Sequence, residues 1–260
     1  MSKASEEKKE LEEELKAART WTILSTRTMQ YMIRKDGIRI YMTKAMAEKD
    51  AEALEEDGFD EEDYMIDGPS YRSLTSITKF CLEYGIGNLT FVKDEERKTF
   101  RIVKPRGDHG YYNPSLARTC ILTKQNKKKK YLLSFANADY ILPIEVDRSE
   151  NFPKLKFCFA RSKKTENLIL ICFTDLSSFA SWQSLADKEN KYAPIKLNFE
   201  QTRRLADSKG FLINPGSLGF VVTEKIMDMI LDAKIQNEQK KKEQTKEKKE
   251  QETQSKKEEG

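Results

Sequence analysis

The chain has 260 residues, of which 38% are hydrophobic and 35% are charged. Because 47 Lys and Arg residues stand against 43 Asp and Glu residues, the formal net charge is only +4. A balance this even gives weak support to a nucleic-acid partner, and the length suits one large domain or two small ones.

The cysteines and the first residues exclude two further classes of protein. Cys81, Cys120, Cys158 and Cys172 form no C-x-x-C pair, and four cysteines in a chain of this length do not make a disulfide scaffold. The opening MSKASEEKKELEEEL lacks the apolar core of a signal peptide, and no run of about 18 apolar residues occurs. We therefore expect a reduced, cytoplasmic protein with no membrane-spanning segment.

The first half of the chain predicts helices that alternate with hairpins. Leu11, Leu15 and Ala18 recur at the spacing of one helical face, and Asp36-Gly37 is a strong hairpin signal. In chain order the pattern predicts a helix over 5–18, a hairpin over 29–43, a helix from Thr43 to Gly58, an acidic loop over 58–70, a helix over 71–84 and a hairpin over 88–103.

The acidic run from Glu55 to Asp67 invites comparison with a calcium-binding loop. The order D-x-[DN]-x-[DN]-G and the terminal Glu of such a loop are absent. We expect a solvated loop and no metal site.

The second half predicts a similar order of elements. Asn198 and Gln201 have the spacing of a capping box. In chain order we expect a helix from Pro114, a second short helix, a strand over 141–146, a hairpin over 154–173, a helix capped by Thr174, a short strand over 192–197, a helix from Asn198 to Gly210 and a hairpin over 211–222.

The hairpin over 154–173 makes a prediction about two cysteines. If it closes symmetrically about Thr165, Phe159 lies opposite Ile171 and Cys158 lies opposite Cys172. In the cytosol we expect these two thiols to be reduced and to pack as small hydrophobic groups.

These patterns predict an α/β (α+β) fold of two tandem, small, mixed-sheet domains flanked by helices. The order hairpin, helix, strand, helix, hairpin appears over both 29–103 and 154–222. After Ile235 the tail has no apolar residue to bury, so it is either disordered or a solvated helix. The predicted parts are an N-terminal domain over 1–104, a linker over 105–112, a second domain over 113–232 and a charged tail over 233–260.

The stretch Asn214-Pro215-Gly216-Ser217 raises the question of whether it holds a phosphate or turns a hairpin. Pro215 lacks the N–H group that a phosphate cradle would use, and a strand follows at Gly219 instead of a helix. Pro at the second and Gly at the third position is typical of a type II turn. We predict a hairpin with a positive φ at Gly216.

Residues 113–232 resemble the SseB N-terminal domain family, the enhanced serine sensitivity proteins. The resemblance lies in YILPIEV, in LILICFTDLSSFASW and in the segment from Pro194 that contains Asn214 to Ser217. Where the family has Asn-Pro-Gly, the first half has Gly85-Ile86-Gly87-Asn88, so residues 20–103 would be a diverged second copy. The resemblance implies a compact α/β fold and brings no catalytic residues.

Few residues suggest a catalytic or metal-binding site. His109 is the sole histidine and lacks partners for a zinc site or a catalytic pair, and Phe179 and Trp182 have the helical spacing of core residues. The favoured function is a non-catalytic interaction or regulatory module with no cofactor and another protein as partner. The alternative is an RNA- or ribosome-associated protein, in which the tail would act with a basic loop of Lys127, Lys128, Lys129 and Lys130.

Overall fold

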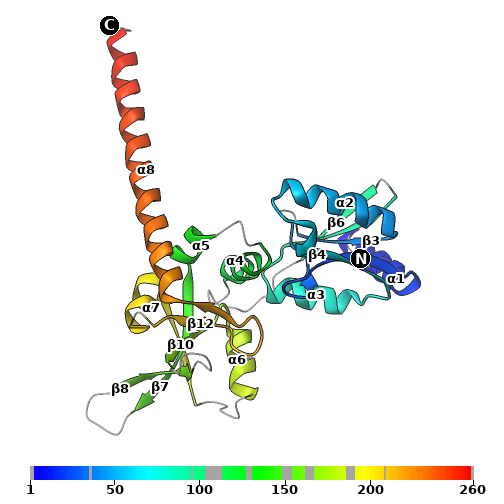
Figure 1. Ribbon diagram of the computed structural model, residues 1–260, viewed down its shortest axis with the longest axis horizontal. Coiled ribbons are helices and arrows are strands. Elements are labelled where there is room, and N and C mark those ends of the chain that lie inside the picture. The colour runs from blue at the N-terminus through cyan, green and yellow to red at the C-terminus, as the bar shows by residue number, and fades with distance from the viewer. Residues whose placement is uncertain are drawn as a thin grey trace.

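The computed structural model describes residues 3–258 apart from 35–36, 95, 103–112, 127–130, 148–153, 162–166, 186–190 and 208. The fold is α+β, as the sequence predicts, and the strands of the described part form three sheets. Figure 1 shows the two halves side by side, with the last helix extending away from the second half. Within the described ranges, no helix is both long and apolar enough to cross a membrane.

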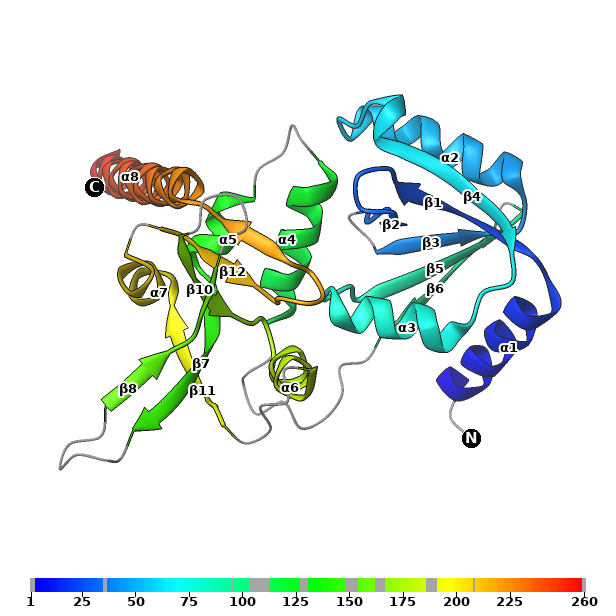
Figure 2. The same ribbon diagram turned by 60° about the horizontal axis from the view of Figure 1, so that its bottom comes forward.

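The first half has helices on both faces of one sheet (Figure 2). Its elements are α1 (Lys3–Ala17), β1 (Thr20–Ser25), β2 (Gln30–Tyr31), β3 (Ile38–Tyr41), α2 (Lys44–Glu56), the 3-10 turn η1 (Glu61–Asp63), β4 (Tyr64–Ser70), α3 (Leu74–Glu83), β5 (Asn88–Lys93) and β6 (Glu96–Arg101). α2 packs on one face through Ala47, Ala51 and Leu54, while α1 and α3 cover the other face through residues such as Leu15 and Ile77.

The second half carries the other two sheets. Its elements are α4 (Pro114–Gln125), α5 (Leu132–Ala136), β7 (Asp139–Asp147), β8 (Lys154–Phe157), β9 (Phe159–Arg161), β10 (Leu168–Cys172), α6 (Leu176–Leu185), β11 (Ala193–Asn198), α7 (Phe199–Leu205), β12 (Phe211–Ile213), β13 (Phe220–Val222) and α8 (Glu224–Glu258). One sheet has the order β13-β12-β10-β9 and the other the order β11-β7-β8. A bridge between Ile141 and Phe173 joins the two sheets.

The strands pair in the same order in both halves. In the first half, β4 pairs with β1, β3 runs parallel to β5, and β5 pairs with β6 in a hairpin. In the second half, β11 pairs with β7, β10 runs parallel to β12, and β12 pairs with β13 in a hairpin. The division into domains at residues 104 and 113 stays a prediction, because one cluster of buried apolar residues extends from Leu11 to Ile230 through both halves.

α4 is bonded to its own half at its start and to the first half at its end. At its start, the Asn113 N–H donates to the Thr174 carbonyl at 2.8 Å. At its end, the buried Gln125 side chain donates to the Tyr31 carbonyl at 2.8 Å and accepts from the Ile33 N–H at 3.2 Å. These bonds satisfy the polar groups of a buried glutamine, and they fix the first half against the second.

Several local predictions are confirmed. Thr43 caps α2 by accepting from the Met46 N–H, and Asn198 and Gln201 form both bonds of the capping box at the start of α7. The helix expected over 71–84 begins slightly later, at Leu74, and one of its faces is buried through Leu74, Ile77, Cys81 and Tyr84. The tail is helical, since α8 continues to Glu258.

Two strands of the first half were missed, and the predicted pairing changes as a result. β1 follows α1 and pairs with both β2 and β3. Of the hairpin expected over 29–43, the described residues keep only a bridge between Arg34 and Gly37. The acidic loop expected over 58–70 contains β4, which pairs with β1. Its Asp63 is buried, and the Arg27 guanidinium, which donates to it at 3.0 Å, offsets the cost of burying this charge.

The predicted register of the cysteine hairpin is wrong by one residue. Phe159 lies opposite Leu170, and the Ile171 N–H donates to the Cys158 carbonyl at 3.0 Å. The strand breaks at Cys158 because β8 pairs with β7 and β9 pairs with β10. Cys158 therefore packs against Ile171 and Phe173, whereas the sulfur of Cys172 belongs to the core on the other face. The break also leaves Leu155 and Phe159 exposed.

Candidate binding groove

A groove of about 650 Å³ lies between α3 of the first half and α6 of the second. The turn between β12 and β13 contributes Pro215, Gly216 and Ser217 to its wall. In Figure 2, α3 and α6 lie along the lower side of the two halves. Since neither half alone supplies both helices, the groove exists only when the two halves are packed together.

The lining combines apolar side chains with hydroxyl groups. The apolar residues are Leu74, Leu82, Trp182, Leu185 and Pro215, and the hydroxyl groups belong to Thr75, Thr78, Ser177, Ser178, Ser181 and Ser217. Leu185 at the end of α6 is 82% exposed. Apolar side chains gathered in a groove, with polar groups among them, are typical of a binding site.

The Asn214–Ser217 segment is a type II turn, which confirms the hairpin prediction. The Ser217 N–H donates to the Asn214 carbonyl at 3.2 Å, and φ at Gly216 is +89°. β12 and β13 pair with Ile213 opposite Phe220. The turn therefore closes a hairpin and also forms part of the groove wall, a role that the sequence pattern did not predict.

Asn214 fixes this turn to the start of α6. Its backbone has a positive φ of +48°, which asparagine tolerates better than most residues. Its buried side chain accepts from the Thr174 N–H at 2.9 Å and donates to the Thr174 hydroxyl at 2.8 Å. The sequence carries no local signal for this pair, because the two residues are 40 positions apart.

The predicted helix cap at Thr174 is displaced by one residue. Asp175 caps α6, since its Oδ1 accepts from the Ser178 N–H at 2.7 Å. Its Oδ2 accepts from the Thr174 hydroxyl at 2.7 Å and the Ser178 hydroxyl at 2.9 Å. The Thr174 N–H and hydroxyl are hydrogen-bonded to Asn214. The carboxylate of the next residue, Asp175, therefore caps the helix.

Lys124 fixes the other end of the same turn. Its ammonium group donates to the Leu218 carbonyl, and burial lowers the pKa of this ammonium. The turn is thus held by α4 on one side and by the start of α6 on the other.

The described residues that line the groove carry more negative than positive charge. Glu12, Glu83 and Asp175 line it, together with Lys79. Burial raises the pKa of the half-buried Glu83, and the Asp175 charge adds to this effect. A ligand that brings a positive charge would therefore stabilise the ionised form of Glu83.

Phe179 and Trp182 take different positions although both were expected in the core. Phe179 is buried, with its ring centroid 5.7 Å from that of Phe173. Trp182 is half-buried and lies between Phe173, at 5.4 Å, and Tyr192, at 5.5 Å between ring centroids. Trp182 also lines the groove, so the aromatic cluster packs beneath this part of the groove wall.

Lys127, Lys128, Lys129, Lys130 and His109 all lie outside the described residues. Within the described ranges, no group of three or more His, Cys, Asp or Glu side chains is arranged to hold a metal ion.

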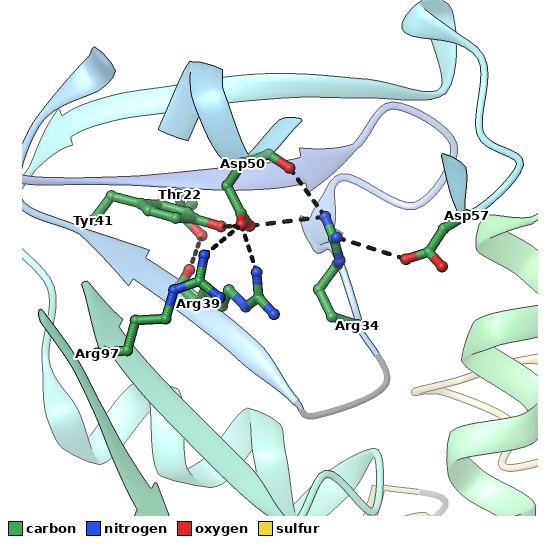
Figure 3. A network of polar contacts seen from close by, with 7 residues as sticks. All are labelled: Thr22, Arg34, Arg39, Tyr41, Asp50, Asp57 and Arg97. Atoms are coloured by element: carbon green, nitrogen blue, oxygen red, sulfur yellow. Dashed lines mark hydrogen bonds and ion pairs between the residues drawn. The ribbon is translucent and has the colours of Figure 1, made fainter. Parts of the chain in front are cut away.

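A second polar site lies in the first half around Asp50 (Figure 3). Asp50 is 8% exposed; its Oδ1 accepts from Arg39 at 2.5 Å and its Oδ2 from the Tyr41 hydroxyl at 2.5 Å. The guanidinium groups of Arg34 and Arg97 lie 3.7 Å and 3.6 Å from the same carboxylate. Sequence reasoning missed this cluster because its members come from α2, β3, β6 and the segment before β3.

The comparisons with known proteins assign no family. No family model matches the chain, and no curated protein matches it. One solved structure, Anabaena Tic22 (protein transport), is similar with 10% identity over 80% of this chain and 88% of its own, at a TM-score of 0.21. A similarity at this TM-score carries no argument about function.

Proposed function

We propose that the protein is a non-catalytic interaction module that binds a segment of another protein in the groove between α3 and α6. The observation that carries this proposal is the groove itself, whose apolar residues come from both halves and whose wall includes the anchored turn at Asn214–Ser217. Its carboxylates favour a partner segment that combines apolar side chains with at least one Lys or Arg.

The lining supports binding more than catalysis. Among the described residues, those that line the groove offer hydroxyl, carboxylate and ammonium groups, with no imidazole or thiol. Asp175 Oδ2 accepts from the Ser178 hydroxyl at 2.9 Å, but it also accepts from the Thr174 hydroxyl, and Oδ1 accepts from the Ser178 N–H as the cap of α6. A carboxylate held in this way is a poor general base.

The two halves would be copies of one unit, with the SseB-like resemblance of residues 113–232 applying to that unit. The shared pairing order of the strands supports this view. The packing of the two units would then have created the groove, as happens at many domain interfaces.

Site-specific photo-cross-linking tests the proposed function. A photoreactive residue in place of Ser181, which is exposed and lines the groove, should capture a distinct protein from nuclease-treated native lysate. Adding Leu185→Arg should abolish the capture, because it places a positive charge where a basic partner docks. The control Ile235→Arg changes an exposed apolar residue of α8 and should leave the capture intact.

Three results would contradict the proposal. Equal loss of capture with both arginine variants would show that the groove is not involved. Loss of all captured protein on nuclease treatment would favour the RNA-associated alternative. Turnover of a metabolite in an unbiased screen would show that the protein is an enzyme.

A further inference from the structure

On the α2 side of the first sheet, β5 and β6 carry threonine and arginine side chains. α2 packs against β1, β3 and β4. Beyond it, Arg39 on β3 lies beside Thr90 on β5, which in turn lies opposite Thr99 on β6. Side chains two residues apart on a strand share a face, so Arg97 and Arg101 flank Thr99 on this surface. We call Arg39, Arg97 and Arg101 the arginine face.

The positive charge of the arginine face exceeds what its nearest carboxylate neutralises. Asp50 accepts strong hydrogen bonds from Arg39 and Tyr41 through its two oxygens, and Arg97 lies 3.6 Å away without a hydrogen bond to it (Figure 3). The Arg97 side chain is 59% exposed. Within the described residues, Arg101 is exposed and makes no ion pair.

Among the described residues, the other carboxylate of this cluster does not reach this surface. Asp57 lies 3.6 Å from Arg34, on the side of Asp50 away from Arg97. Its charge therefore offsets that of Arg34 and leaves Arg97 and Arg101 available to a ligand.

We propose that the arginine face binds an acidic protein segment in an extended conformation. Arg97 and Arg101 are four residues apart on one strand, which places them roughly 14 Å apart at about 3.4 Å per residue. Carboxylates at positions i and i+4 of an extended segment have the same spacing. The complementary sequence is therefore Glu-x-x-x-Glu, or its Asp equivalent.

The same strand pair already binds carboxylates within this chain. On the opposite side of β6, Lys98 lies 3.9 Å from Glu10 of α1, and Lys93 at the end of β5 lies 3.2 Å from Glu14. Charged residues on an edge strand also discourage aggregation. That role alone does not require arginine, whose planar guanidinium suits two-point recognition of a carboxylate.

Peptide binding to the full-length protein tests this proposal. The probe is a fluorescein-labelled peptide of sequence Gly-Glu-Ser-Thr-Ser-Glu-Gly, and the readout is fluorescence anisotropy at low salt. Arg97→Gln and Arg101→Gln should each weaken binding by about three- to five-fold, as expected for exposed ion pairs worth up to ~1 kcal/mol. The matched control is Arg161→Gln on β9, another exposed arginine at the edge of a sheet, and it should have no effect.

A second peptide, with Gln in place of both Glu residues, completes the double-mutant test. It should bind weakly, and Arg97→Gln should not weaken it further. Equal loss with Arg161→Gln, or equal binding of both peptides, would overturn the proposal. Tighter binding of a phosphoserine peptide through the same arginines would overturn the assignment of the ligand as a carboxylate. Arg101→Gln removes no ion pair among the described residues, so this variant should fold like the parent and its loss of binding can be assigned to the missing charge.

Discussion

Asn214 and Thr174 are held together by two hydrogen bonds, although they are 40 residues apart in the sequence. The bonds connect the turn after β12 to the residue before the cap of α6. Both residues are almost fully buried. This pair therefore determines where the groove wall formed by Pro215 to Ser217 lies relative to α6.

Removing either partner should destabilise the protein. Asn214→Ala leaves the Thr174 N–H and hydroxyl without their partner in a buried site, so we expect a loss of about 2–3 kcal/mol in the free energy of unfolding. Thr174→Val should also destabilise, whereas Thr174→Ser keeps the hydroxyl and should stay within about 1 kcal/mol of the parent. Urea unfolding measures all three, and equal stability of the Val and Ser variants would contradict the role of the hydroxyl.

Two glycines with positive φ should respond differently to alanine. At Gly216 (φ +89°) an added Cβ meets nothing within 4 Å, so Gly216→Ala should cost only the backbone strain, about 1 kcal/mol. At Gly85 (φ +64°) the Cβ would lie 2.1 Å from the Pro114 carbonyl oxygen. Gly85→Ala should cost about 3 kcal/mol or more and loosen the contact between α3 and α4.

Thermal unfolding of both glycine variants provides the comparison. A milder effect at Gly85 than at Gly216 would show that α3 and α4 do not pack as closely as the structure has them.

Glu83 should make the stability of the protein depend on pH. Burial raises the pKa of Glu83, so the folded protein keeps this proton to a higher pH than the unfolded chain does. Stability therefore falls as the pH rises from the ordinary Glu pKa of about 4.3 through the raised value. Glu83→Gln should reduce this fall and stabilise the protein at neutral pH.

Chemical unfolding as a function of pH checks the role of Glu83. The control Glu56→Gln makes the same chemical change on an exposed position of α2, outside the groove. An identical pH profile for both variants would contradict the assignment.

The last helix should divide into a structural part and a dispensable part. Met227 and Ile230 are buried in the core, and Lys234 pairs with Glu200 at 3.2 Å. Ile230→Ala should destabilise by about 2–5 kcal/mol through the cavity it leaves. Deleting residues 239–260 should change the free energy of unfolding by less than about 0.5 kcal/mol, because the described side chains beyond that point are exposed. A large loss on truncation, measured by urea unfolding, would show that the tail contributes to the fold.

The sequence by itself determined the features that depend on neighbouring residues. The cap at Thr43, the capping box of Asn198 and Gln201 and the type II turn at Pro215-Gly216 all form as predicted. Each depends on backbone groups within a few residues, so the local pattern contains the whole of the physical cause. The same holds for the buried face of α3, which follows from helical spacing.

Only the tertiary structure decided the features that join distant residues. β1 and β4 form because each supplies the other's hydrogen bonds across some 40 residues, and the register at Cys158 changes because β7 competes with β10 for the same segment. The groove between α3 and α6, the Asn214–Thr174 pair and the arginines around Asp50 arise in the same way. Their members share no sequence spacing, since packing of the two halves and of separate strands brings them together.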